Sequence, residues 1–129
     1  MTHIAIVGGS LAGLAAAVAL NRLGILVSVF ESFPGTFEQR GSSLGYVDVP
    51  LWENLRGAPM MRLGSRANRQ QGAYYYGDLW KFLYDGLPEG CVKFNHPVRD
   101  LGDDIMRPTI DGKVYDAVII ADGGFSSLR

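Results

Sequence analysis

Apolar residues gather in short runs near the start of the chain, and the order of these runs predicts a β-α-β unit. HIAIV, at residues 3–7, is a β-branched run that passes directly into glycine, which is typical of a buried strand. From Ser10 to Leu23 small and apolar residues recur at helical spacing, and Gly24 is placed to end this helix. ILVSVFE, at residues 25–31, is nearly all apolar, as expected when both faces of a parallel sheet are covered.

The second half of the chain predicts another helix, a hairpin and a closing strand. GDLWKFLYDGLPEG is amphipathic, with Leu79, Phe82 and Leu83 on one face, and CVKF and PVRDL follow as short strand candidates. In IMRPTIDGKVYD, Asp111-Gly112 is a two-residue hairpin signal, and DAVIIADG is again an apolar strand that runs into glycine. The expected fold class is α/β, a Rossmann-like parallel sheet with flanking helices and an inserted antiparallel β-hairpin.

The stretch between residues 32 and 77 is long for a connection and rich in Gly, Pro, Ser and Arg, which indicates a functional loop. One short helix is expected in it, over VPLWENL at residues 49–55. Arg62, Arg66 and Arg69 form a local cluster, for which a solvated loop is the simpler interpretation than an anion site.

Composition indicates one globular domain and argues against several kinds of partner and site. The chain has 129 residues, 47% of them apolar and 19% charged, with a net charge of -1, so nothing suggests a nucleic-acid partner. Its apolar runs are shorter than the roughly 18 residues of a membrane span, and a cytoplasmic location is expected. Cys91, the one cysteine, excludes an internal disulfide and is interpreted as a small buried hydrophobe rather than a nucleophile. No metal cluster is expected, because His3 and His96 are far apart in the sequence.

A glycine-rich turn between the first strand and the first helix predicts a dinucleotide site. Gly8 and Gly13 hold the outer positions of a G-x-G-x-x-G pattern, and Ser10 stands at the middle position. Gly8 permits the tight turn, Gly13 lets helix and strand approach, and the helix N-terminus offers N–H groups to a pyrophosphate. Serine is a preferred N-cap whose hydroxyl can bond to a helix N–H or to a phosphate oxygen.

The acidic residue at the end of the second strand completes this motif. Glu31 can accept hydrogen bonds from a ribose diol, and its charge disfavours the 2′-phosphate of NADP at this site. The alternative is an ordinary glycine-rich turn in which Glu31 is a solvated strand end.

Four motifs, in this order, resemble those of the flavin-dependent aromatic hydroxylases: IVGGSLAGL, VFES, QRGSSLGY and ADGGFSSLR. The resemblance is closest to the branch that acts on hydroxylated pyridines, and it is poor at about residues 57–73. It implies the FAD-binding part of a monooxygenase that hydroxylates an aromatic substrate with NAD(P)H and O2. The cofactor-binding residues that it implies are Gly8, Ser10, Leu11, Ala12, Gly13, Glu31, Ser32, Arg40, Val98, Asp122 and Gly123.

The resemblance also implies individual roles for the later residues. Arg40 contacts the phosphate region, and the backbone of a strand at Val98 lies near the adenine. Asp122-Gly123 faces the pyrophosphate and the route of the nicotinamide cofactor, and Arg129 closes the motif. Arg40 could instead belong to a surface ion pair, and Asp122-Gly123 could be a plain strand-ending turn.

Two features depart from the family pattern. The family often carries an arginine where this chain has Tyr74–Tyr76, which we interpret as a packed strand rather than a stacking platform, so one cofactor contact is in doubt. The family also continues into a substrate-covering sheet beyond ADGGFSSLR. Residues 1–129 are therefore expected to form an FAD-binding domain whose substrate domain is absent from the chain.

Two other functions stay open at this point. One is a non-catalytic flavin- or nucleotide-binding module, or a subunit that completes its site with a partner or as a homo-oligomer. The other is an NAD-binding dehydrogenase domain, which shares the first motif but does not account for Arg40 or for ADGG.

Overall fold

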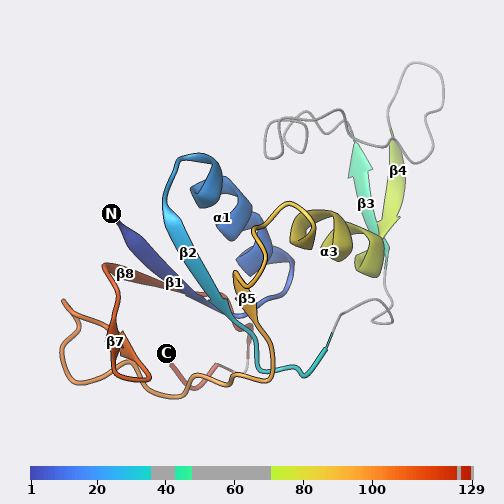
Figure 1. Ribbon diagram of the computed structural model, residues 1–129. Coiled ribbons are helices and arrows are strands. Elements are labelled where there is room, and N and C mark those ends of the chain that lie inside the picture. Colours follow the sequence, from blue (N-terminus) through green and yellow to red (C-terminus); the bar gives the residue numbers. More distant parts are fainter. Residues whose placement is uncertain (36–42, 48–70, 125, 129) are drawn as a thin grey trace.

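A computed structural model describes residues 1–35, 43–47, 71–124 and 126–128 (Figure 1). Its central sheet has four parallel strands in the order β5-β2-β1-β8. These strands are β1 (His3–Val7), β2 (Leu26–Phe30), β5 (Val92–Lys93) and β8 (Ala117–Ile120). β1 pairs with β2 on one side, with His3 opposite Leu26, and with β8 on the other, with Ile4 opposite Ala117. The predicted β-α-β unit and the parallel sheet are confirmed.

The alternation of side chains along β1 gives the sheet two buried faces. Ile6 packs with Leu14 and Val18 of α1 (Leu11–Arg22), which covers one face, whereas Ala5 and Val7 belong to a second cluster on the opposite face. Gly24 ends the helix as predicted, with φ +77° and its N–H bonded to the carbonyl oxygen of Asn21 at 3.0 Å.

The second face of the sheet is covered by the segment that contains the predicted hairpin. β6 (Thr109–Ile110) and β7 (Lys113–Val114) pair in antiparallel fashion around Asp111 and Gly112, whose φ angles of +50° and +78° fit a primed turn. Ile110 and Tyr115 from this segment pack against Phe30 of β2. The hairpin prediction is confirmed.

The helix predicted in the second half is shorter and begins earlier than the pattern suggested. α3 runs over Tyr76–Tyr84, and the chain then turns, with the N–H of Gly86 bonded to the carbonyl oxygen of Leu83 at 3.0 Å. Phe82 is only partly buried, and Trp80, which is 1% exposed, takes its place in the core. α3 packs against α1 (Figure 1).

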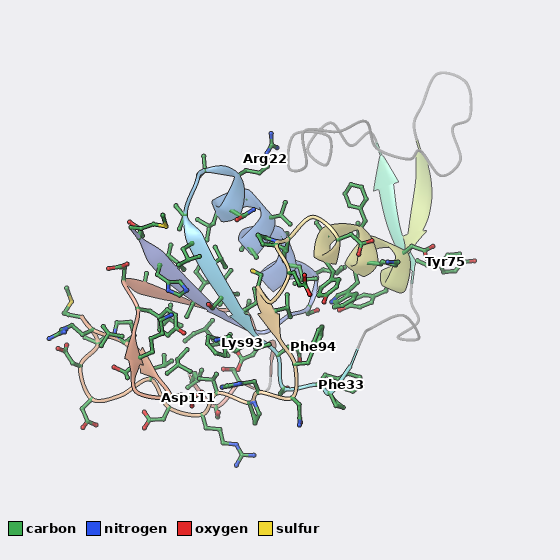
Figure 2. All side chains as sticks on the ribbon, in the orientation of Figure 1. Arg22, Phe33, Tyr75, Lys93, Phe94 and Asp111 are labelled. Atoms are coloured by element: carbon green, nitrogen blue, oxygen red, sulfur yellow. The ribbon has the colours of Figure 1, made fainter. Side chains whose placement is uncertain are left out.

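An antiparallel pair that the sequence analysis did not predict precedes α3. β3 (Ser43–Val47) pairs with β4 (Gln71–Tyr75), and β4 continues directly into the helix. The tyrosine run is therefore divided, because Tyr75 ends the strand and Tyr76 begins the helix. Tyr75 lies in a strand, as interpreted, but it is not packed, because it is 70% exposed and points away from the body of the molecule (Figure 2). The helix expected over residues 49–55 and the arginine cluster lie outside the described residues.

The strand candidate PVRDL is also corrected. Only Val92–Lys93 of the preceding candidate pair with β2, and Asn95 then adopts a φ of +51°, which turns the chain off the edge of the sheet. Val98 consequently lies in an irregular segment. Within the described ranges, no helix is both long enough and apolar enough to cross a membrane.

Candidate functional site

A cleft of about 540 Å³ opens where β1, β2 and β8 end. Gly8 follows β1, Glu31 follows β2 and Asp122 follows β8, and all three line the cleft. The chain leaves β1 toward β2 on one side and β8 lies on the other, so this edge is a topological switch point, where open α/β sheets bind ligands. The predicted cofactor residues that line the cleft are Gly8, Ser10, Ala12, Glu31, Ser32, Val98, Asp122 and Gly123.

Two of the predicted residues that the structure describes do not line the cleft. Leu11 and Gly13 lie in the first turn of α1, where Leu11 packs against the core and Gly13 is buried. Arg40 lies outside the described residues, as does Arg129. Their roles toward a cofactor stay predictions.

Gly8 and Gly13 allow the helix to sit directly on the end of β1. A Cβ added at Gly13 would lie 1.8 Å from the carbonyl oxygen of Gly8, and one added at Gly8, which has φ +107°, would lie 2.3 Å from the carbonyl oxygen of Ala121. Only glycine fits such backbone approaches. The start of α1, whose first N–H groups have no acceptor within a helix, is thereby brought to the cleft.

Glu31 is a buried anchor of the glycine-rich turn rather than a solvated strand end. Its side chain is 7% exposed, and Oε2 accepts the N–H of Gly9 at 2.7 Å. Oε1 accepts the N–H of Phe33 at 2.8 Å and the hydroxyl of Ser32 at 3.3 Å. Each carboxylate oxygen has two acceptor sites, so this carboxylate can hold the turn and still accept a hydroxyl from a ligand in the cleft. The alternative interpretation of Glu31 is wrong.

Helix α3 holds the same turn from the other side, and this contact was missed by the sequence analysis. The indole Nε1–H of Trp80 donates to the carbonyl oxygen of Gly9 at 2.7 Å. The Gly9 residue is therefore bonded through its N–H to Glu31 and through its carbonyl to Trp80. A buried tryptophan needs an acceptor for its N–H, and that need was the available signal.

Ser10 is the N-cap of α1, but its side chain makes no capping bond. Its Oγ lies 2.6 Å from the hydroxyl oxygen of Tyr76 instead. Of the two bonds open to this hydroxyl, the one to a helix N–H is not formed, and the one to a phosphate oxygen stays a prediction.

The far wall of the cleft comes from the segment after β5. His96, Val98 and Arg99 line it, and His96 Nε2 lies 2.5 Å from Asp111 Oδ2 of the hairpin turn. Figure 2 shows Asp111 on the hairpin side of the sheet. Arg99 adds a cation to the lining that the sequence analysis did not single out, although it directly follows the predicted Val98.

Cys91 is buried in the core, where its Sγ lies 3.4 Å from the carbonyl oxygen of Val27. Burial raises the pKa of this thiol and so disfavours the reactive thiolate. Its interpretation as a buried hydrophobe is confirmed. Across the described part of the chain, no three His, Cys, Asp or Glu side chains are grouped to hold a metal ion.

Comparisons with known proteins agree with the motifs. Two proteins of Streptomyces platensis, both described as 3-amino-4-hydroxybenzoate 2-monooxygenases, are 29% identical over 131 aligned positions. Each alignment covers 72% of this chain and 33% of the relative. This chain resembles the flavin-dependent aromatic hydroxylases. No family model matches it.

Solved structures show that the fold is shared as well. CtdE in complex with FAD superimposes with a TM-score of 0.74 at 18% identity, over 100% of this chain and 40% of its own length. The 2,6-dihydroxypyridine-3-hydroxylase of Arthrobacter nicotinovorans gives a TM-score of 0.72 at 24% identity, over 99% of this chain and 38% of its own length. The chain thus has the fold of part of these proteins and spans about a third of the curated relatives that it matches.

Proposed function

We propose that residues 1–129 are the FAD-binding domain of a monooxygenase that hydroxylates an aromatic substrate with NAD(P)H and O2. The observation that carries the proposal is the buried carboxylate of Glu31. It lines the cleft, and its Oε2 accepts the N–H of Gly9 at 2.7 Å. An acidic residue in this place suits the ribose of an adenine dinucleotide. The resemblance to flavin-dependent hydroxylases favours FAD over other dinucleotides.

The described residues fit the adenosine diphosphate half of FAD. Glu31 would accept the ribose hydroxyls, and the start of α1 with Ser10 would meet the pyrophosphate. The backbone at Val98 would lie beside the adenine, and Asp122-Gly123 would border the pyrophosphate from the end of β8. When bound, FAD supplies the electron transfer and oxygen chemistry, whereas this chain supplies binding and orientation.

We also propose that the substrate is held outside these residues, by a further domain or by a second copy of the chain. The cleft residues are assigned to the cofactor, and the curated relatives are covered to only 33% of their length. We place the protein in the cytoplasm, where NAD(P)H is available and a free buried thiol such as Cys91 stays reduced.

Titration of the purified chain with FAD and NAD⁺ tests the cofactor assignment. We expect FAD to bind with quenching of its fluorescence and to bind more tightly than NAD⁺. Glu31→Gln should weaken FAD binding roughly tenfold or more, because the new amide turns a donor toward the N–H of Gly9 or Phe33. Glu89→Gln, at an exposed loop carboxylate, is the matched control and should leave FAD affinity unchanged.

Two results would contradict the assignment. Binding of NAD⁺ in preference to FAD would favour the dehydrogenase alternative. If the Glu31→Gln variant binds FAD as tightly as the wild type, FAD does not bind in the cleft beside Glu31.

A further inference from the structure

Two hydroxyl groups meet beside the cleft, and only one of them belongs to its lining. Ser10 lines the cleft at the start of α1, and its Oγ lies 2.6 Å from the hydroxyl oxygen of Tyr76. Tyr76, the first residue of α3, is partly buried and does not line the cleft. The hydroxyl of Tyr76 therefore reaches the cleft through its contact with Ser10.

The proton count of this pair decides what it can do. A hydroxyl has one donor and two acceptor sites. One of the two groups therefore donates its single proton to the other and has no proton left for a second partner. When Tyr76 donates, the proton of Ser10 is left for another acceptor. A phenol, with a pKa of about 10, is the more acidic of the two hydroxyls and so the better donor.

We propose that Tyr76 is a positioning residue that donates to Ser10 and so directs the Ser10 proton toward a phosphate of the bound dinucleotide. This inference rests on the proposed function, since it needs a phosphate ligand at the start of α1. The two hydroxyls then form a short relay from Tyr76 to Ser10 to the anion. Such chains of hydrogen bonds strengthen one another where solvent is limited.

The position of Tyr76 is fixed by the rest of α3. Trp80, one turn further along the helix, is 1% exposed and donates to the carbonyl oxygen of Gly9 at 2.7 Å. Tyr84 stacks on Trp80 with ring centroids 4.9 Å apart and an interplanar angle of 12°. The helix and the glycine-rich turn are therefore held together by a buried bond, and the Tyr76 hydroxyl is delivered to Ser10 by packing that does not depend on a ligand.

A double-mutant cycle on the full chain tests this relay. Dissociation constants for FAD and ADP would be measured with the wild type, S10A, Y76F and S10A/Y76F. We expect Y76F to raise the dissociation constants of FAD and ADP roughly three- to tenfold, which is the range for one hydrogen bond in a partly buried site. In the S10A background the same change should have no effect, because its route to the ligand is gone. Tyr84→Phe is the matched control, since it removes a phenol hydroxyl from the same helix, and it should leave both constants unchanged.

Adenosine, which lacks phosphate, separates the relay from a general effect on the cleft. Its binding, followed by NMR, should be the same in the wild type and in Y76F. Thermal unfolding without ligand would be measured on every variant.

The possible results divide cleanly between the two proposals. A wild type that binds neither FAD nor ADP contradicts the proposed function. The relay is overturned if the wild type binds FAD and Y76F binds it equally well. A lower unfolding temperature of Y76F with unchanged FAD affinity counts as the same result. The relay is also overturned if Y76F weakens binding to the same extent in the S10A background, or if it weakens adenosine as much as ADP.

Discussion

Replacement of Gly13 by alanine tests whether the cleft depends on the direct approach of α1 to the end of β1. The added Cβ would lie 1.8 Å from the carbonyl oxygen of Gly8, whereas real Cβ atoms essentially never come within 3.0 Å of a neighbour. The gap must therefore open by more than about 1 Å, and both sides of it are backbone, which cannot rotate away. The helix has to move as a unit and loosen the packing of Leu14 and Val18 on the sheet.

The cost can be set against that of a glycine with the opposite problem. Overpacking by a methyl group costs about 1–3 kcal/mol where side chains can shift, so we expect about 3 kcal/mol or more for Gly13→Ala. Gly24 has a φ of +77° but nothing within 4 Å of an added Cβ, so Gly24→Ala carries only backbone strain of about 1 kcal/mol. In a domain of this size these values correspond to losses in Tm of roughly 10–15 °C and roughly 4 °C.

Thermal unfolding followed by far-UV circular dichroism compares the three proteins, and FAD titration follows on those that stay folded. Gly13→Ala should also weaken FAD binding, since the start of α1 is displaced from the cleft. If Gly13→Ala unfolds within about 3 °C of Gly24→Ala, or binds FAD like the wild type, the close approach does not have the role assigned to it.

Three further predictions concern side chains around the sheet. Trp80→Phe leaves the carbonyl of Gly9 without its buried donor, so we expect the free energy of unfolding in urea to fall by about 2 kcal/mol. An unchanged urea midpoint would contradict a stabilising role for this hydrogen bond. Burial, followed by the charges of Lys113 and Lys93, lowers the pKa of His3, so the folded chain holds this side chain neutral while the unfolded chain takes up a proton below about pH 6.5. Stability should be complete above that pH and fall as the pH drops below it, and the loss between pH 7 and pH 5 should be smaller in His3→Gln; equal losses in both proteins would show that His3 contributes nothing. Because burial raises the pKa of Cys91, a thiol reagent should label it slowly in the native chain and rapidly in urea, and rapid native labelling would contradict this burial.

The first part of the site could be predicted from the sequence because its causes are local. A strand, a glycine turn and a helix follow one another within residues 3–24, and Glu31 ends the next strand at the spacing that the motif requires. What could not be predicted is how other segments contact this unit. Trp80 and Gly9 are 71 residues apart, and their bond follows from the packing of α3 on α1.

The pairing of β3 with β4 and the false strand at PVRDL have local causes of their own. SLGYV and QGAYY each contain a glycine and lack a clear alternation of apolar and polar residues, so their pairing gave no signal in the sequence. PVRDL had the composition of a strand, but the positive φ of Asn95 had already turned the chain away from the sheet. A backbone angle of this kind is set by the surrounding contacts as much as by the residue itself.

The pairing of β1 with both β2 and β8 gives the cleft a particular place in the order of folding. β2 reaches β1 after one helix, whereas the bond between His3 and Asp116, beside β8, joins residues 113 apart. Closing so long a loop is entropically costly, so we expect β8 to dock after the first β-α-β unit has formed. Glu31 belongs to the unit that forms first, and Asp122 follows the strand that docks later, although both line the cleft. A ligand that contacts both residues would therefore stabilise the docked position of β8 against the first unit.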